Sequence, residues 1–284
     1  MHYWQTLRPQ QWIKNAFVWA GFLFARAWGD AGLATKVAIA FVAFCLIASA
    51  VYIVNDLIDR DADRAHPLKR DRPIASGRVN AGGAAALAVL LAVAGFALAT
   101  AAGSALVATL LSYVALNVAY SLALKRVVII DVIAVALGFL LRILAGTLGV
   151  GIEPSPWLLM CGLMLTLLLG FGKRRAELVS VAPSGSRAVL VDYSPALLDR
   201  LITVCVGGTL ISYSLYTISP QTILLHGSAN LVYSVPIVTY ALFRYLYLLD
   251  AGHAAEDPSR LFMSDHHLQL AAVAWVGAVL WILR

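Results

Sequence analysis

The stretch KVAIAFVAFCLIASAVYIVNDLIDRDAD, residues 36–63, decides the fold class. Residues 36–55 are almost entirely apolar, whereas residues 55–63 carry four aspartates and an asparagine. A helix needs about 20 apolar residues to cross the hydrocarbon core of a bilayer. The stretch therefore predicts a transmembrane helix whose end is unusually acidic.

The rest of the chain repeats this apolar character. Of its 284 residues, 61% are hydrophobic and 13% are charged, whereas soluble domains are roughly 45–50% apolar. Open strands leave unsatisfied backbone groups in lipid, so the apolar segments are expected to be helices. We predict an all-α polytopic membrane protein, a bundle of nine transmembrane helices, with spans near 12–28, 36–55, 82–101, 104–122, 128–149, 155–172, 198–217, 229–249 and 267–283.

The charges of the connecting segments predict the topology. Lys and Arg gather after the second, fourth, sixth and eighth segments, and are absent after the third, fifth and seventh. By the positive-inside rule, the cation-rich connections and the N-terminus are cytoplasmic, and the C-terminus lies outside. The net charge of +6 is interpreted as orientation and contact with anionic lipid, and no nucleic-acid partner is predicted. We expect a single domain, 1–284, whose active-site cavity opens to the cytoplasmic face.

The acidic end predicts a metal site. Spacings of three, four and seven residues place its polar side chains on one helical face: Asn55, Asp56, Asp59 and Asp63. Like charges at that spacing repel, and carboxylate and amide oxygens suit Mg²⁺ shared with substrate phosphates. The alternative is a polar helix end that Arg60 and Arg64 neutralise.

Cation-rich clusters follow at the same predicted membrane face. Each could be a simple membrane anchor, but together with the acidic face they favour a pocket for a metal-complexed polyphosphate. The substrate-binding candidates of these clusters are Lys69, Arg70, Arg72, Tyr120, Lys125, Lys173, Arg174 and Glu177.

Two ionisable residues lie inside a predicted span. Asp131 and Arg142 are eleven residues apart and therefore on nearly the same helical face. Charges within the membrane are costly and face a bundle interior or a water-filled cavity. We expect both to line one substrate cavity; the alternative for Arg142 is a structural ion pair with another helix.

Nine helices with N55-D56-x-x-D59-x-x-x-D63 after the second resemble the UbiA superfamily of intramembrane prenyltransferases over essentially the whole chain. Members of that family bind a pyrophosphate donor through Mg²⁺ on two aspartate-rich motifs, and an acceptor attacks the donor carbon as pyrophosphate leaves. The resemblance implies that Asp56, Asp59 and Asp63 are catalytic. No second D-x-x-x-D run is present in this sequence.

Four other pieces look like the decaprenyl-phosphate phosphoribosyltransferase branch: RPQQWIKN (8–15), DRAHPLKRDRPIASG (63–77), DV-x(5)-GFxLRxLAG (131–146) and GKRRAEL (172–178). That resemblance implies a bacterial plasma-membrane enzyme with phosphoribosyl pyrophosphate as donor and a polyprenyl phosphate as acceptor, serving arabinan-type envelope sugars. It also makes Lys14 a substrate-binding candidate. The additional cations suit a donor that carries a 5-phosphate and an acceptor that carries a lipid phosphate.

Other functions stay open. The near rival is prenyl transfer from a prenyl pyrophosphate to a small aromatic acceptor by the same fold and metal. A cation-coupled transporter fits less well, because transporters place ionisable groups near the bilayer midplane with repeat symmetry. A homo-oligomer is compatible with the sequence, which does not specify the oligomeric state.

Overall fold

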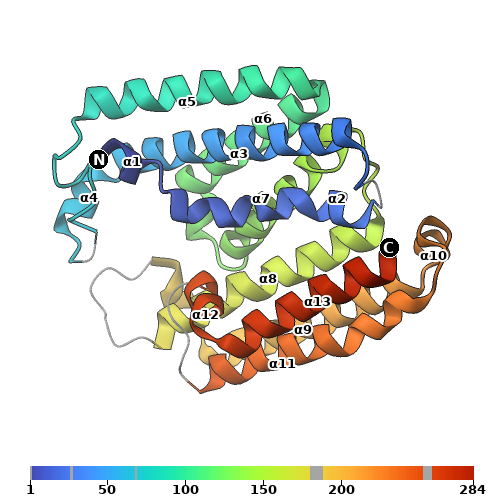
Figure 1. Ribbon diagram of the computed structural model, residues 1–284. Coiled ribbons are helices and arrows are strands. Elements are labelled where there is room, and N and C mark those ends of the chain that lie inside the picture. The colour runs from blue at the N-terminus through green and yellow to red at the C-terminus, as the bar shows by residue number, and fades with distance from the viewer. Residues whose placement is uncertain (1, 26–27, 68, 180–187, 252–257) are drawn as a thin grey trace. The chain divides into compact units, whose positions relative to one another are not determined.

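The computed structural model describes residues 2–25, 28–67, 69–179, 188–251 and 258–284, and every regular element in these ranges is a helix (Figure 1). The first half contains α1 (His2–Thr6), the 3₁₀ helix η1 (Pro9–Trp19), α2 (Ala20–Phe24), α3 (Ala31–Ile58), α4 (Arg60–Ala65), α5 (Ala81–Ala102), α6 (Ser104–Leu122), η2 (Leu124–Arg126) and α7 (Ile130–Ala145). The second half contains η3 (Leu148–Val150), α8 (Pro156–Val179), η4 (Ala188–Asp192), α9 (Pro195–Ile218), α10 (Pro220–His226), η5 (Asn230–Ser234), α11 (Val235–Asp250), α12 (Pro258–Ser264) and α13 (His266–Leu283).

The prediction of an all-helical, multi-pass protein is confirmed. Within the described ranges, eight helical segments are long and apolar enough to cross a membrane: Ala31–Ile58, Ala81–Ala102, Ser104–Leu122, Ile130–Val150, Pro156–Val179, Pro195–Ile218, Asn230–Asp250 and His266–Leu283. They match the second to ninth expected spans. The first expected span, 12–28, is instead covered by η1 and α2, and its residues 26–27 lie outside the described ranges.

The chain divides into two compact units. The first comprises Met1–Lys125 and Leu137–Pro154, and the second comprises Arg126–Ala136, Ser155–Ala182 and Ser186–Arg284. Helix α7 begins in the second unit and ends in the first. The expectation of a single domain stays a prediction.

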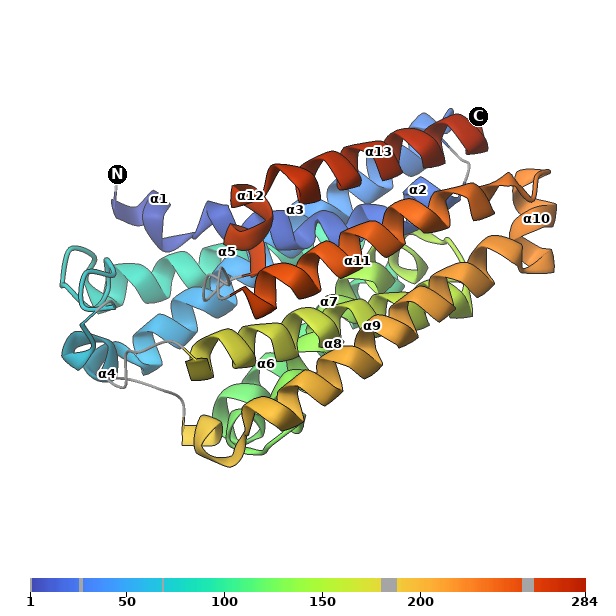
Figure 2. The same ribbon diagram turned by 90° about the horizontal axis from the view of Figure 1, so that it is seen from below.

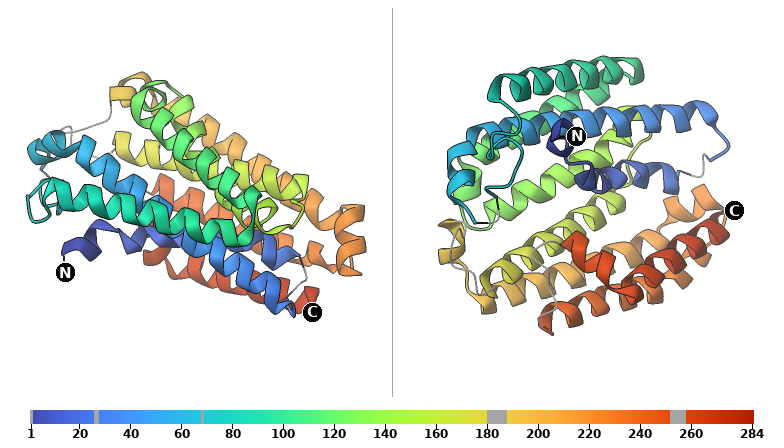
Figure 3. Two further views of the ribbon diagram at one scale, coloured as in Figure 1. Left: turned by 90° about the horizontal axis from the view of Figure 1, so that it is seen from above. Right: turned by 60° about the vertical axis from the view of Figure 1, so that its left-hand side comes forward.

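In the first unit, α3 packs along α5, and η1 runs beside α3 (Figures 1 and 3). Gly103 alone separates α5 from α6, and its φ of 136° lies in a region that favours glycine. A single residue thus ends one span and begins the next. Helices α1 and α4 lie at the same end of this unit (Figure 1).

In the N-terminal segment, which comprises η1 and α2, every third residue from Asn15 to Gly21 is buried. In a 3₁₀ helix, side chains at i and i+3 eclipse one another, and Asn15, Val18 and Gly21 are buried at that spacing. Close contact continues to the end of α7, where a Cβ built on Gly146 would lie 1.6 Å from the Val18 carbonyl oxygen. Only glycine at position 146 allows the two backbones to meet.

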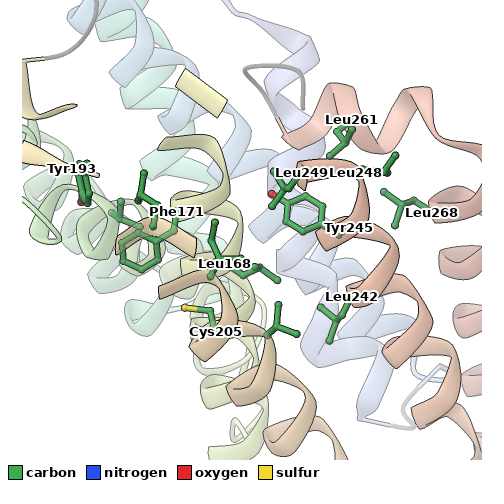
Figure 4. Close-up of a cluster of buried hydrophobic side chains, with 14 of the residues drawn as sticks. Leu168, Phe171, Tyr193, Cys205, Leu242, Tyr245, Leu248, Leu249, Leu261 and Leu268 are labelled. Atoms are coloured by element: carbon green, nitrogen blue, oxygen red, sulfur yellow. The ribbon is translucent and has the colours of Figure 1, made fainter. Parts of the chain in front are cut away.

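In the second unit, α8 packs along α9, and α11 packs along α13 (Figure 2). Their facing sides form one hydrophobic cluster that includes Leu168, Phe171, Leu242, Leu248 and Leu268 (Figure 4). Burying each such side chain contributes about 1.5–3 kcal/mol relative to water, and less relative to lipid. Close packing, rather than water exclusion, therefore holds these helices together.

Candidate active site: two charged networks

The acidic residues of the first unit surround a helix break. Helix α3 ends at Ile58, Asp59 caps it, and α4 begins at Arg60. Asp56 and Asp63 are 5% and 4% exposed, whereas Asp59 is open to solvent and Asn55 is half-buried. The sequence had predicted that these four residues share one face of a continuous helix. The helix instead breaks at Asp59, and the four side chains differ in exposure. Among the described residues, no three His, Cys, Asp or Glu side chains are grouped so as to hold a metal ion.

A guanidinium group joins the two buried carboxylates. Arg72 Nη1 donates to Asp63 Oδ2 at 2.6 Å and to Asp56 Oδ1 at 3.1 Å. One cationic nitrogen thus lies between two carboxylates that are seven residues apart. The sequence expected Arg72 to bind substrate; the structure places it on the acidic residues themselves.

A second guanidinium group reaches the same carboxylate from the N-terminal segment. Arg8 Nη2 lies 2.5 Å from Asp56 Oδ1, and its guanidinium carbon is 5.5 Å from the centre of the Tyr52 ring. Arg8 has a left-handed backbone, with φ 53°, directly before Pro9 at the start of η1. No sequence pattern predicted this role, because αL geometry in an arginine leaves no compositional signal.

Three further hydrogen bonds hold η1 in register against α3. Trp12 Nε1 donates to Ser49 Oγ at 3.0 Å, and Ser49 Oγ donates to the Leu7 carbonyl at 2.9 Å. Asn15 Nδ2 lies 3.1 Å from Cys45 Sγ. These contacts fix the position of Arg8 and present the half-buried Lys14 on the same segment.

The end of α6 meets the end of α3. Ser121 Oγ donates to Asn55 Oδ1 at 3.1 Å, so Tyr120 and Lys125, two predicted site residues, lie on the segment that contacts the acidic residues. Lys69 is half-buried and Arg70 is exposed in the turn that also carries Arg72. Ser121 was not singled out by the sequence, since one serine at a helix end is unremarkable.

Arg142 occupies a separate cage. Its guanidinium donates to Asn15 Oδ1 at 2.7 Å, to the Gly138 carbonyl at 2.8 Å and to Tyr113 Oη at 3.2 Å. The rings of Phe44, Tyr113 and Phe139 lie 4.9, 4.9 and 5.2 Å from its central carbon. In the described part of the chain its partners are all neutral, so the alternative of an ion pair with another helix is not what the structure shows. Cation–π contacts stabilise the charge instead.

Asp131 belongs to a different network, in the second unit. It is fully buried and accepts a hydrogen bond from Arg174 Nε at 2.7 Å and one from Tyr193 Oη at 2.7 Å. Among the described residues, the hydrogen-bond partners of Asp131 differ from those of Arg142, and the expectation that both line one cavity stays a prediction. Carboxylate and guanidinium satisfy each other, as a buried charge requires.

The same network includes further residues of α8 and the backbone just before α7. Arg174 Nη1 donates to Glu177 Oε2 at 2.6 Å, and Lys173 Nζ lies 3.9 Å from Glu177 Oε1. The Ile129 N–H donates to Tyr193 Oη at 2.7 Å. Burial and the bond to the Asp131 carboxylate raise the pKa of the Tyr193 hydroxyl, so it stays protonated and donates. Arg174 is 3% exposed and joins Asp131 to Glu177; its predicted part in substrate binding stays a prediction.

Sequence and structure comparisons agree with this architecture. Residues 15–266 match the UbiA prenyltransferase family. The chain belongs to that family. This UbiA-family chain is 36% identical over 287 residues to the decaprenyl-phosphate phosphoribosyltransferase of Mycolicibacterium smegmatis, covering 97% of this chain and 90% of the relative. It is 37% identical over 284 residues to the protein of that name from Corynebacterium glutamicum, covering 97% and 84%.

Solved structures show the same fold. A UbiA homolog from Archaeoglobus fulgidus, bound to GPP and Mg²⁺, superposes with a TM-score of 0.76 at 17% identity, covering 100% of this chain and 99% of the homolog. The match of residues 15–266 to the family model confirms the resemblance to the UbiA superfamily that was inferred from the helices and the acidic motif, and the solved structure agrees in fold.

Proposed function

We propose that this protein transfers the 5-phosphoribosyl group of phosphoribosyl pyrophosphate to a polyprenyl phosphate such as decaprenyl phosphate, releasing pyrophosphate. The observation that carries the proposal is near-full-length similarity to relatives named decaprenyl-phosphate phosphoribosyltransferase. The charged groups suit such substrates, because Lys and Arg side chains are the usual ligands of phosphate oxygens. The product would supply envelope arabinan synthesis.

Mg²⁺ fits the acidic residues chemically. All four predicted ligands offer hard oxygen donors, which Mg²⁺ prefers, and Asp56 and Asp63 already converge on one cationic nitrogen. Asn55, Asp56, Asp59 and Asp63 would hold the ion, which when bound stabilises the negative charge that develops on leaving pyrophosphate.

The chain's own residues do the remaining work by binding and orientation. Lys14, Lys69, Arg70 and Lys125 in the first unit, and Lys173 in the second, are the cations proposed to bind phosphates. A phosphate monoester has a second pKa of about 6, so the lipid phosphate is already deprotonated at neutral pH. Its oxygen forms the new bond to ribosyl C1 as the bond from C1 to the pyrophosphate oxygen breaks, and no general base is needed.

The membrane arrangement also belongs to the proposal. Eleven 3₁₀ residues rise about 22 Å, and the five residues of α2 add about 7.5 Å, which together match a hydrocarbon core of about 30 Å. Residues 9–24 can therefore form a ninth span in the bacterial plasma membrane. The cation-rich connections favour a cytoplasmic N-terminus and site, with the C-terminus outside.

The decisive assay uses purified protein, Mg²⁺, radiolabelled phosphoribosyl pyrophosphate and decaprenyl phosphate. Label should enter the organic phase only when lipid phosphate is present, and chelation of the metal with EDTA should abolish this transfer of label. The rival reaction is prenyl transfer, and the observation in its favour is the similarity in fold to a homolog solved with GPP. Consumption of a prenyl pyrophosphate, without transfer of ribosyl label, would replace the proposal with that rival.

A matched pair of variants tests the acidic residues. Asp59→Asn should lower turnover about 100-fold, equivalent to about 2.7 kcal/mol in the barrier, because it removes one proposed metal ligand. Asp61→Asn makes the same change two residues away, where the carboxylate is 83% exposed and contacts Arg60 and Arg64. Equal activities of the two variants would remove Asp59 from the site.

A further inference from the structure

The two arginines on the acidic residues differ in how firmly they are held. Arg8 is fixed by its αL backbone, by Pro9, by the Tyr52 ring and by the hydrogen bonds between η1 and α3 described above. Arg72 comes from the turn between α4 and α5, and its side chain is 31% exposed. The two side chains are about equally exposed, 28% for Arg8 and 31% for Arg72. The difference lies in the backbone, because Arg8 precedes a segment that packs on α3, whereas Arg72 belongs to the turn between α4 and α5.

Arg72 occupies two of the carboxylates that are proposed to hold a divalent cation. Its Nη1 atom touches Asp56 Oδ1 and Asp63 Oδ2 together. A divalent cation held by Asp56 and Asp63 would compete with Arg72 for these two carboxylates, and the two positive charges would repel each other at that distance. Arg8 stays on Asp56, but Asp63 depends on Arg72 for its ion pair. Two buried carboxylates repel each other, so either Arg72 or a divalent cation at this position stabilises the pair.

A pyrophosphate provides the alternative partner that Arg72 needs in order to leave. Guanidinium groups bind phosphate oxygens with the same paired geometry that they use for carboxylates. Entry of the metal at Asp56 and Asp63 then releases Arg72, and the released Arg72 can bind the donor. Each event lowers the cost of the other, which is thermodynamic coupling between two ligands.

We propose that Arg72 is an exchangeable counter-ion of the acidic residues: it neutralises Asp56 and Asp63 in the donor-free protein and passes to the donor pyrophosphate when the divalent cation takes its place. The inference rests on the proposed function for the identity of the donor. Metal binding is consequently weak without pyrophosphate and strong with it, and Arg72 sets the difference.

The test measures Mn²⁺ binding directly, by the loss of the free-ion EPR signal on titration into detergent-solubilised protein without any substrate. Arg72→Gln should bind Mn²⁺ about tenfold more tightly than wild type, which corresponds to about 1.4 kcal/mol. Arg78→Gln is the matched control: it removes an equal charge from the same turn, where Arg78 bonds to Ser76 and the Asp71 carbonyl. The control should change the affinity by less than about twofold, as expected for a screened surface charge.

Pyrophosphate provides the second arm. Adding it should tighten Mn²⁺ binding by wild type about tenfold, one step of 1.4 kcal/mol, beyond its effect on Mn²⁺ in protein-free buffer, and should leave Arg72→Gln nearly unchanged. Equal Mn²⁺ affinities for Arg72→Gln and Arg78→Gln, or an equal pyrophosphate effect in wild type and Arg72→Gln, would overturn the proposal.

A conservative variant guards against a folding defect. Arg72→Lys keeps the charge but replaces the weakly hydrated guanidinium by a strongly hydrated ammonium group, which binds the buried carboxylates less well. It should raise the Mn²⁺ affinity about threefold, half of the tenfold step on a logarithmic scale. No increase would count against the exchange. Because Mn²⁺ and pyrophosphate are the probes, these results stand apart from the ribosyl assay: a protein that transfers no ribosyl label could still show the exchange, and the reverse also holds.

Discussion

Replacing Asp131 by asparagine removes the charge against which Arg174 is buried, while keeping the shape of the side chain. The amide oxygen can still accept the hydrogen bond from Tyr193, so the loss is confined to the ion pair. Removing one partner of a buried pair costs about 3–5 kcal/mol. Arg174 keeps Glu177, whose side chain is 18% exposed, so we expect the lower end of that range, about 3 kcal/mol.

The assay is reversible unfolding in mixed dodecylmaltoside–SDS micelles, run as a double-mutant cycle with Arg174→Met. Asp131→Asn leaves the buried Arg174 with Glu177 as its remaining ion pair, and Arg174→Met leaves the buried Asp131 without its ion pair, whereas the double variant removes both charges. The double variant should therefore cost less than the sum of the two, with a coupling energy of about 2–3 kcal/mol, in the range for contacting residues.

Kinetics distinguish this structural role from substrate binding. With the folded fraction corrected for, Asp131→Asn should keep the wild-type KM for the soluble donor. The reasoning is refuted if Asp131→Asn costs less than about 1 kcal/mol, the upper range of an exposed pair, and instead raises KM. That outcome would return Asp131 to the substrate-binding set in which the sequence had placed it.

Gly146→Ala should destabilise the protein by more than about 4 kcal/mol, since its Cβ would meet the Val18 backbone. The control is Gly207→Ala, whose Cβ would have nothing within 4 Å and which should change stability by less than about 1 kcal/mol. Similar unfolding midpoints for the two variants would contradict the close approach of Gly146 to Val18. The hydrogen bond from Arg244 holds the pKa of Asp265 below its ordinary value, so its contribution to stability is present above the unfolded pKa of about 3.9 and is lost as pH falls through the folded one. Asp265→Asn should therefore flatten the acid side of the curve of unfolding midpoint against pH, and an unchanged slope would exclude this linkage.

Much of the candidate site was visible in the sequence, but its pairings were not. Asp56 and Asp63 were singled out from their spacing, and they lie together on one cation. Arg8, which is 48 positions from Asp56, was not. Helical spacing predicts neighbours within one helix, whereas a contact between distant segments depends on how those segments pack.

The N-terminal segment shows the same limit in its backbone. Its apolar residues predicted a membrane span, but a 3₁₀ helix of eleven residues is longer than the usual three or four, and propensity alone would not select it. Burial of Asn15 and Val18, three positions apart in η1, and the close approach of Val18 to Gly146 stabilise this tighter winding.

The sequence by itself determined that the chain is a helical membrane protein with an acidic helix end, because backbone groups in lipid must be satisfied within each segment. Its acidic motif and basic pieces also determined the family. Only the tertiary structure decided which groups stabilise each charge. Arg8 and Arg72 pair with Asp56, Arg174 pairs with Asp131, and aromatic rings surround Arg142. The interaction energy of two charges depends on their distance in space and is larger where the local dielectric constant is low. Which buried charges pair therefore depends on how the helices pack.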